Sequence, residues 1–237
     1  MIKDLVFVGA GAFREQIEIV NDINQLSPAY RVLGILDDNY ELHGKDILGV
    51  KVLGPLETVG KFATAAFVMG VGSNRARLAT QSIFDKLNVP LENYETLIHP
   101  SAKIYSSAKI GIGTIIHAGC IVGNGSILGD FTKVIWNAVI GADNILGDGV
   151  TICANSTTSS GVKIGGYTFI AGQCAIADNI MIGPMTKIGL GSVIARDVDA
   201  GSFMLGNPAR KIDSAIVPAA LIKKWEKTIS KDATDMR

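Results

Sequence analysis

The sequence has few aromatic residues and no excess charge of either sign. Phe, Trp and Tyr make up 6% of its 237 residues, whereas 48% are hydrophobic, so the core must be built mainly from aliphatic side chains. Lys and Arg number 22, as do Asp and Glu, and the formal net charge is zero. A surface that binds nucleic acid needs an excess of basic residues. We therefore expect no nucleic-acid partner.

Long apolar runs and cysteines are also scarce. No run reaches the roughly 20 apolar residues of a membrane-spanning helix, and the first residues lead into a strand instead of a signal peptide. We therefore expect a cytoplasmic protein with no membrane partner. The three cysteines are Cys120, Cys153 and Cys174. Cys120 and Cys174 occupy small positions of the repeat described next, which favours packing over redox or metal chemistry, so we expect no metal site.

The sequence does contain a six-residue repeat, from Ile98 to Ile194. An α-helix has no period of six, and a plain strand repeats every two residues. A hexapeptide period is typical of a β-helix, in which each repeat supplies one short strand and one corner. The residue two positions before the centre is mostly small, and the next residue is often glycine, which we expect to relieve the corner. Sixteen of the seventeen central positions are aliphatic and only Thr158 is not: Ile98, Ile104, Ile110, Ile116, Val122, Leu128, Val134, Ile140, Leu146, Ile152, Thr158, Ile164, Ile170, Ile176, Ile182, Ile188, Ile194.

The repeat resembles the left-handed β-helix of the hexapeptide acyltransferases, in which three repeats, about 18 residues, form one triangular coil. The resemblance implies acyl transfer, whereas the repeat alone also fits a solenoid with no catalytic role. After the repeat, apolar residues between positions 216 and 229 follow a helical spacing. We expect an amphipathic helix that covers the open end of the solenoid, because terminal repeats need such a cap.

Apolar strands and helices alternate in the first 95 residues. Such alternation predicts a short βαβ domain with a parallel sheet, half the size of a doubly wound sheet. We therefore expect it to hold one nucleotide at most. Strands are expected at residues 5–9, 30–36 and 65–70, and helices at residues 15–24, from Leu56 onward, and at 75–87.

A Gly-x-Gly turn follows the first strand. Gly9 and Gly11 let backbone amides approach a phosphate at a helix N-terminus. Asp37 ends the second strand, where an acidic side chain can hold a ribose hydroxyl. Arg14 replaces the third glycine of the dinucleotide motif, which argues against a full dinucleotide site. A turn needed only for tight packing is the alternative.

The order of the two domains is similar to that of the acetyltransferases of bacterial sugar biosynthesis. These include the bacillosamine-pathway and perosamine N-acetyltransferases and the proteins called sialic-acid O-acetyltransferases. The motifs that carry this resemblance span most of the chain: Gly9-Ala10-Gly11, Leu36-Asp37-Asp38, Gly70-Val71-Gly72-Ser73-Asn74, Ile98-His99-Pro100-Ser101-Ala102 and Gly206-Asn207-Pro208-Ala209.

In that family the N-terminal domain holds the nucleotide of a UDP- or GDP-sugar. The resemblance implies that Gly9 and Gly11 face the diphosphate, and that Asp37 or Asp38 contacts the uridine or its ribose. It implies a contact of the nucleotide edge or phosphate with three further residues, Ser73, Asn74 and Arg77. The family often has a histidine near the position of Phe13, which cannot donate to a phosphate or a sugar.

The catalytic histidine of the family is missing here. Its members carry an Ile-Asp-His-Asp type of segment, in which the histidine accepts the proton of the attacking group and its acidic neighbour orients it. The corresponding segment is Ile140-Gly141-Ala142-Asp143-Asn144, so Ala142 stands at the histidine position. Asp143 is a candidate base, and otherwise a solvated or ligand-orienting carboxylate. The other candidates are His117 across a subunit boundary, the substrate amine itself, and water.

Three interpretations of the missing histidine stay open. The chain is a nucleotide-binding relative without activity, an enzyme with a relocated base, or an enzyme that needs no protein base. A neutral amine attacks a thioester unaided, whereas a hydroxyl needs a general base, whose removal costs about 10²–10⁴-fold in rate. The missing histidine therefore favours N-acetylation over O-acetylation. Of the three histidines, we expect His43 to be solvated, and His99 and His117 to stack in one outward column as surface or interface residues.

The same resemblance implies how acetyl-CoA binds. Ser160, which lies one coil beyond Ala142, is expected to supply the backbone N–H that holds the thioester oxygen. Coenzyme A lies between neighbouring β-helices of a homotrimer in this family. Its expected contacts here are Ser160, Gly172, Gly189 and Leu190. Outward apolar residues, including Phe131, Ile135 and Trp136, agree with such an assembly.

We therefore predict a nucleotide-sugar-binding βαβ domain over residues 1–95. A left-handed β-helix acyltransferase domain follows over 96–212, and a capping helix with a tail over 213–237. The expected reaction is acetyl-CoA-dependent N-acetylation of a nucleotide-linked amino sugar, UDP-linked rather than GDP-linked, such as a UDP-4-amino-4,6-dideoxy sugar used for surface glycans. A sugar O-acetyltransferase and an inactive nucleotide-binding relative are the alternatives.

Overall fold

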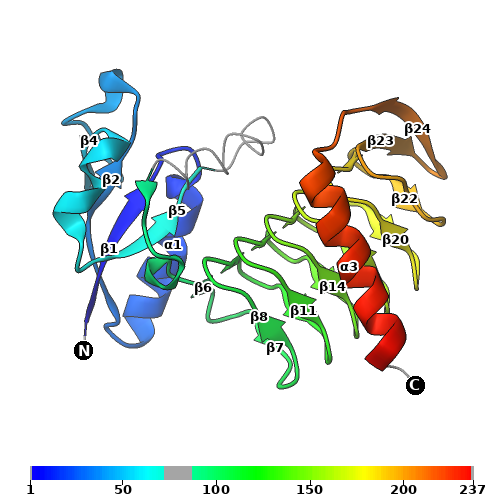
Figure 1. Ribbon diagram of the computed structural model, residues 1–237. Helices are drawn as coiled ribbons and strands as arrows, with labels where there is room; N and C mark the ends of the chain where they lie inside the picture. Colours follow the sequence, from blue (N-terminus) through cyan, green and yellow to red (C-terminus); the bar gives the residue numbers. More distant parts are fainter. Residues whose placement is uncertain (1, 72–86, 236–237) are drawn as a thin grey trace. The chain divides into compact units, whose positions relative to one another are not determined.

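The computed structural model describes residues 2–71 and 87–235, and the side chains of these residues as far as Lys227. It divides into two compact units, Met1–Pro100 and Ser101–Arg237 (Figure 1). The helix expected at residues 75–87 lies outside the described part except for Leu87.

The first unit is a five-stranded α/β sheet with the order β3-β4-β2-β1-β5. Strands β1, β2, β4 and β5 are parallel, and β3 and β4 form an antiparallel hairpin that the sequence did not suggest. The segment from Leu56 is a 3₁₀ helix, not the expected α-helix. The elements are β1 (Lys3–Val8), α1 (Phe13–Leu26), β2 (Tyr30–Leu36), η1 (Tyr40–Leu42), β3 (Asp46–Ile47), β4 (Val50–Gly54), η2 (Leu56–Phe62), β5 (Ala66–Met69), η3 (Leu91–Asn93) and β6 (Leu97–Ile98).

The second unit is a parallel β-helix built from two-residue strands. From β7 to β19, each strand pairs with the third strand after it, as β13 does with β16 and β16 with β19, which gives three sheets joined by corners. The strands are β7 (Lys103–Ile104), β8 (Lys109–Ile110), β9 (Ile115–Ile116), β10 (Ile121–Val122), β11 (Ile127–Leu128), β12 (Lys133–Val134), β13 (Val139–Ile140), β14 (Ile145–Leu146), β15 (Thr151–Ile152), β16 (Thr157–Thr158), β17 (Lys163–Ile164), β18 (Phe169–Ile170), β19 (Ala175–Ile176), β20 (Met181–Ile182), β21 (Lys187–Ile188) and β22 (Val193–Ile194).

The second residue of each strand is the central residue of the six-residue repeat. From Ile116 to Ile194 every one of these side chains is buried, Thr158 included, so the predicted stacking is confirmed. Glycine often follows this central residue and was expected to relieve the corner, but the structure gives it another role. A side chain at Gly141 would lie 2.4 Å from the carbonyl oxygen of Ser159, so the next coil requires glycine there. The strained backbone falls two residues later, where Asp143 has a φ of 56°.

The C-terminal elements follow the last coil. Strand β23 (Ser202–Gly206) pairs with β21, and β24 (Ala209–Ser214) folds back on it as a hairpin. Helix α3 (Ala219–Asp235) runs along the side of the β-helix (Figure 1). Its Lys224 binds the carboxylate of Asp148, at the corner after β14. The prediction that this helix covers the open end of the solenoid is therefore wrong.

Candidate functional site

The glycine turn after β1 is held tightly by the end of β5. Gly9 has a φ of 90°, and a Cβ there would meet the Val71 side chain at 2.7 Å. A Cβ on Gly70 would lie 2.1 Å from the carbonyl oxygen of Gly9. The Ala12 N–H donates to the carbonyl oxygen of Gly70 at 2.7 Å. Gly9 and Gly70 must be glycine because the two segments approach this closely, whereas Gly11 has room for a small side chain.

Most amides of this turn are already used within the protein. The Gly9 N–H donates to the Leu36 carbonyl oxygen at 2.7 Å, and the Ala10 N–H donates to Asp37 Oδ2 at 2.7 Å. Within residues 2–71 and 87–235, the Gly11 N–H has no acceptor. Of the two glycines expected to face a diphosphate, only Gly11 therefore offers an amide, at the start of α1 where an anion is favoured.

Both acidic residues after β2 organise backbone. Asp37 accepts from Ala10 through one oxygen and from the Asn39 N–H through the other, at 2.8 Å. Asp38 accepts from the Leu56 N–H at 2.9 Å. A carboxylate has about four acceptor sites, so either side chain retains capacity for a ribose hydroxyl. Asp37 thus links the glycine turn to the end of β2, which the sequence could not show.

The remaining predicted nucleotide contacts are less favourable or not described. The Phe13 side chain is completely buried and packs edge-on against Phe7, with ring centroids 4.8 Å apart. It faces the core, so it offers no surface to a ligand. Ser73, Asn74 and Arg77 lie outside the described residues.

In the β-helix, Ala142 and Ser160 lie at equivalent corners of consecutive coils. The pairing of β13 with β16 and of β16 with β19 fixes this register, so Asn124, Ala142, Ser160, Asp178 and Arg196 form one corner column. Each member of the column from Asn124 to Asp178 precedes a residue with positive φ, such as Gly161 at 69°. A positive φ is what the third residue of a type II turn requires.

The backbone N–H groups of this column lack acceptors within the described chain. The amides of Ala142 and Ser160 donate to no described residue, whereas those of Asp143 and Gly161 donate to the coil before. On another corner the equivalent amides are capped by carboxylates. The Ile112 N–H donates to Asp130 Oδ1 at 2.8 Å. The Ser160 amide is therefore free to donate to a ligand, which is what its predicted role at a developing oxyanion requires; that role stays a prediction.

Beneath this corner lies a buried polar pair that the sequence analysis missed. Asn144 is fully buried, and its Nδ2 donates to Thr158 Oγ1 at 2.6 Å. Asn144 Oδ1 accepts from the Val162 N–H at 2.6 Å, and Thr158 Oγ1 accepts from the Gly141 N–H at 3.2 Å. The pair therefore fixes both flanks of the corner that carries Ala142 and Ser160. The signal was present, because Asn144 occupies a usually small position and Thr158 an aliphatic one.

Asp143 has the conformation of a corner residue. Its side chain is exposed and folds over the previous coil, so that a Cβ on Gly125 would lie only 2.1 Å from Asp143 Oδ1. Asn137 and Asn179 fold in the same way over Gly119 and Gly161. The position of this carboxylate therefore follows from the fold and requires no catalytic explanation.

The other expected coenzyme A contacts lie on a different corner. Gly172 and Leu190 are equivalent residues of consecutive coils, and the Leu190 side chain would meet a Cβ on Gly172 at 3.4 Å. Gly189 precedes Leu190 and packs under the Leu205 side chain. Gly172, Gly189 and Leu190 lie at corners that lead from the sheet of β12, β18 and β21 to the sheet of β13, β19 and β22. Ser160 lies at the next corner along the chain, which leaves the latter sheet after β16. One subunit alone does not bring them to Ser160.

The histidines are more constrained than expected. His117 is buried, and its ring packs edge-on against Trp136 at 4.9 Å, so it is not the exposed surface residue that was one of the two expectations for it. His99 Nε2 lies 2.6 Å from Asp22 Oδ2. His43 Nε2 lies 2.8 Å from the Asp37 carbonyl oxygen, so it supports the loop after β2 and is not simply solvated.

Neither cysteine chemistry nor a metal site is indicated. Cys120 and Cys174 are buried, as a packing role requires, and this burial raises the pKa of both thiols. Within the described residues, no group of histidine, cysteine and acidic side chains has the arrangement of a metal site. No described helix is long and apolar enough to span a membrane.

Comparisons with known proteins bear on the two domains and their fold. Residues 4–86 match the family described as the PglD N-terminal domain. A comparison with curated proteins gave no significant match. Among solved structures, the acetyltransferase domain of PglB from Neisseria gonorrhoeae in complex with acetyl coenzyme A has 26% identity and a TM-score of 0.77, over 90% of this chain and 100% of that one.

Two further structures share the whole architecture. PerB from Caulobacter crescentus, in complex with CoA and GDP-perosamine, has 23% identity and a TM-score of 0.75, over 90% of this chain and 99% of that one. WeeI from Acinetobacter baumannii has 19% identity and a TM-score of 0.67, over 90% and 100%. The fold is therefore that of the left-handed β-helix acetyltransferases. With the PglD-type domain before it, the predicted resemblance to the hexapeptide-repeat sugar N-acetyltransferase family is confirmed, and so is the prediction of an acetyl-CoA-dependent enzyme.

Proposed function

We propose that the chain transfers the acetyl group of acetyl-CoA to the amine of a nucleotide-linked amino sugar, without a protein base. The observation that carries this proposal is the corner of Ala142 and Ser160, which offers an amide without a described acceptor and has no histidine. PerB, a relative in fold, was solved with CoA and GDP-perosamine, a nucleotide-linked amino sugar. The Gly11 N–H, which has no acceptor among the described residues and lies at the start of α1, supports a role in binding the diphosphate.

The chemistry needs little from the protein beyond positioning. The neutral amine attacks the thioester carbonyl, and its oxygen takes the negative charge, which the Ser160 N–H stabilises. The carbon–sulfur bond then breaks, the thiolate of CoA leaves, and the nitrogen loses its extra proton to water or to that thiolate. The products are the N-acetylated sugar and CoA. A hydroxyl nucleophile would need a base that this corner lacks.

The proposal includes a homotrimer in the cytoplasm and a UDP-linked sugar. The trimer would account for the two corners described above, because coenzyme A held between neighbouring β-helices would contact Ser160 of one subunit and Gly172 and Leu190 of another. Exposed apolar side chains on the β-helix, including Trp136 at 40% and Leu190 at 67%, also favour an assembly.

The activity is tested with the purified protein, acetyl-CoA and a UDP- or GDP-linked 4-amino sugar. We expect the release of one CoA thiol per acetylated amine, measured by mass spectrometry of the sugar and by a thiol reagent, with a background correction for the protein cysteines. Acetylation of a sugar hydroxyl instead of the amine would favour the O-acetyltransferase. Binding of the nucleotide sugar without turnover of any amino sugar would favour an inactive relative.

Restoring the histidine tests whether a base has been lost. For Ala142→His we expect kcat with the amino sugar to change by less than about tenfold, because the amine needs no general base. Ala142→Asn is the control, since it adds a polar side chain that cannot act as a base. A rise of about 10²–10⁴-fold in the histidine variant alone would show that the natural protein is a degenerate enzyme.

A further inference from the structure

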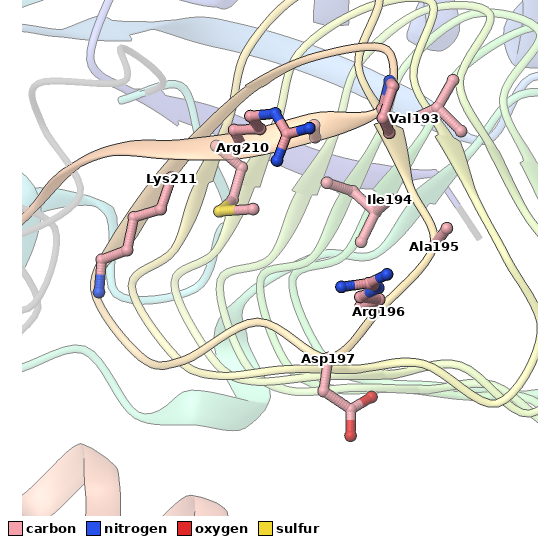
Figure 2. Close-up of a pocket in the computed structure, with 10 residues that line it drawn as sticks. Val193, Ile194, Ala195, Arg196, Asp197, Arg210 and Lys211 are labelled. Carbon is pink, nitrogen blue, oxygen red and sulfur yellow. The ribbon is translucent and has the colours of Figure 1, made fainter.

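A cavity of about 430 Å³ lies at the C-terminal end of the β-helix, away from the coil that carries Ser160. Arg196 and Arg210 line it, between β22 and the β23–β24 hairpin (Figure 2). The described residues that line it all fall between positions 193 and 211. The surroundings of the Ser160 amide are therefore set by its own coil and by the coils packed against it.

Hydroxyl side chains clamp several corners of the β-helix in the same way. Ser126 Oγ donates to the Gly141 carbonyl oxygen at 2.8 Å and accepts the Asn144 N–H at 3.2 Å. One hydroxyl therefore ties the residue before a corner to the residue after it. The same clamp is formed at other corners by Thr114, Ser156 and Thr168.

The corner that carries Ser160 is held differently. Asn144 stands at the clamping position, and its Oδ1 accepts the Val162 N–H at 2.6 Å, as a hydroxyl would. Its Nδ2 donates to Thr158 Oγ1 at 2.6 Å instead of to the Ser159 carbonyl oxygen. That carbonyl oxygen accepts no hydrogen bond from any residue that the structure describes. A planar side-chain amide and a threonine hydroxyl thus replace the single hydroxyl of the other corners.

Both replacements depart from the pattern that builds the core. Thr158 is the single polar residue among the seventeen central positions of the repeat, where the others stack aliphatic side chains. Asn144 is completely buried, although burial removes its amide from water and leaves both of its polar atoms to be satisfied by the protein. Proteins break such local rules mainly at functional sites. These two departures meet in one hydrogen bond, beneath the corner of Ala142 and Ser160.

We propose that Asn144 and Thr158 are positioning residues that aim the Ser160 N–H at the thioester oxygen during acetyl transfer, an inference that rests on the proposed function. The Asn144 amide ties Thr158, before the corner, to Val162, after it. The peptide between Ser159 and Ser160 is therefore oriented by its neighbours and not through its own carbonyl. Both side chains are buried, so they act on the reaction through that peptide and not by touching a ligand. A donor to a developing oxyanion works only when it is already in place.

The first test gives this coil the clamp of the other corners. In the variant Asn144→Ser/Thr158→Val, the serine can bond the Ser159 carbonyl oxygen and the Val162 N–H, as Ser126 does one coil earlier, and valine is a usual central residue. We expect its melting temperature to be no lower than that of the wild type. Its kcat should fall by about 10–100-fold, because small errors in the placement of a reacting group are costly. KM for both substrates should stay near the wild-type value, since the buried pair contacts neither.

A double-mutant cycle shows whether the pair acts through Ser160. In a Ser160→Pro background the N–H is absent, so Asn144→Ser/Thr158→Val should lower kcat no further. Losses that multiply would overturn the inference. The control is Thr168→Val, which breaks the equivalent clamp at the corner of Pro184. It should lower the melting temperature and leave kcat unchanged, and an equal loss of kcat in this control would also overturn the inference.

Hydrogen exchange of the protein without substrates separates this inference from the proposed function. Thr158→Val leaves the Asn144 side chain with one anchor, so the Val162 N–H should exchange about tenfold faster, whereas Thr168→Val should leave its rate unchanged. A Val162 rate that Thr158→Val does not change refutes the anchoring. An active wild type whose Asn144→Ser/Thr158→Val variant keeps its kcat refutes the positioning role alone. A wild type that acetylates no amino sugar, with the faster exchange in Thr158→Val, refutes the proposed function and leaves the anchoring of the corner standing.

Discussion

Replacing Ser160 with proline is expected to lower kcat by about 100–1,000-fold, because proline lacks the backbone N–H that every other residue would keep at this position. This is the usual effect of deleting one donor to the oxyanion of an acyl-transfer reaction. The Ser160 amide has no acceptor in the described chain, so its loss breaks no described hydrogen bond. The measurement is kcat with saturating acetyl-CoA and amino sugar.

The corner can accept this proline. Pro184 already occupies the equivalent turn position of another corner, followed by Met185 with a φ of 56°. Ser160 is likewise followed by Gly161, with a φ of 69°. Proline is favoured at the second position of a type II turn, just before the residue with positive φ. We therefore expect Ser160→Pro to fold with a melting temperature close to that of the wild type.

Ser160→Ala is the matched control. It removes the hydroxyl but keeps the amide, so its kcat should stay within a few-fold of the wild type. Equal activity of the alanine and proline variants would show that the Ser160 N–H does not stabilise the oxyanion. A large loss in both would assign the effect to the hydroxyl, and a fall in melting temperature in the proline variant alone would be recognised as a folding defect.

The six-residue repeat predicted the β-helix well because the same short pattern, one aliphatic residue in every six, recurs along the whole domain. One aliphatic side chain per repeat must point inward, so the position of each strand can be read from Ile104 to Ile194 without knowing the coils. The glycines were misinterpreted for the opposite reason. Gly141 is required by the backbone of Ser159, which comes near only after the chain has completed a full coil. The six-residue pattern shows that glycine recurs but not which contact requires it.

The candidate sites show the same limit. The turn at Gly9 and Gly11 was predicted, yet which amides stay available depends on Leu36, Asp37 and Gly70, which lie on later strands far along the sequence. The position of Ser160 one coil beyond Ala142 could be predicted by counting, because the coil length is constant. A cavity lined by Arg196 and Arg210 could not be predicted, since Arg210 lines it only when β24 folds back on β23.

The polar pair beneath the corner gives the second large effect. Thr158→Val replaces the hydroxyl with a methyl group, and leaves Asn144 Nδ2 buried without the acceptor that now lies at 2.6 Å. A buried polar group without a partner costs about 1–3 kcal/mol. Each kcal/mol lowers the melting temperature of a chain of this size by about 2–4 °C. We therefore expect Thr158→Val to lower the free energy of unfolding by about 1–3 kcal/mol, measured by urea titration.

The double variant Asn144→Val/Thr158→Val should recover part of that loss. Valine already fills the equivalent inward position at Val150 and Val162, so it suits the space left by Asn144. The Val162 N–H loses its acceptor, but the Ile180 N–H one coil later has no described acceptor either. The double variant should therefore be more stable than Thr158→Val alone, with a coupling of about 0.5–3 kcal/mol between the two sites. Strictly additive losses would show that the two side chains do not stabilise each other, although they lie within hydrogen-bond distance.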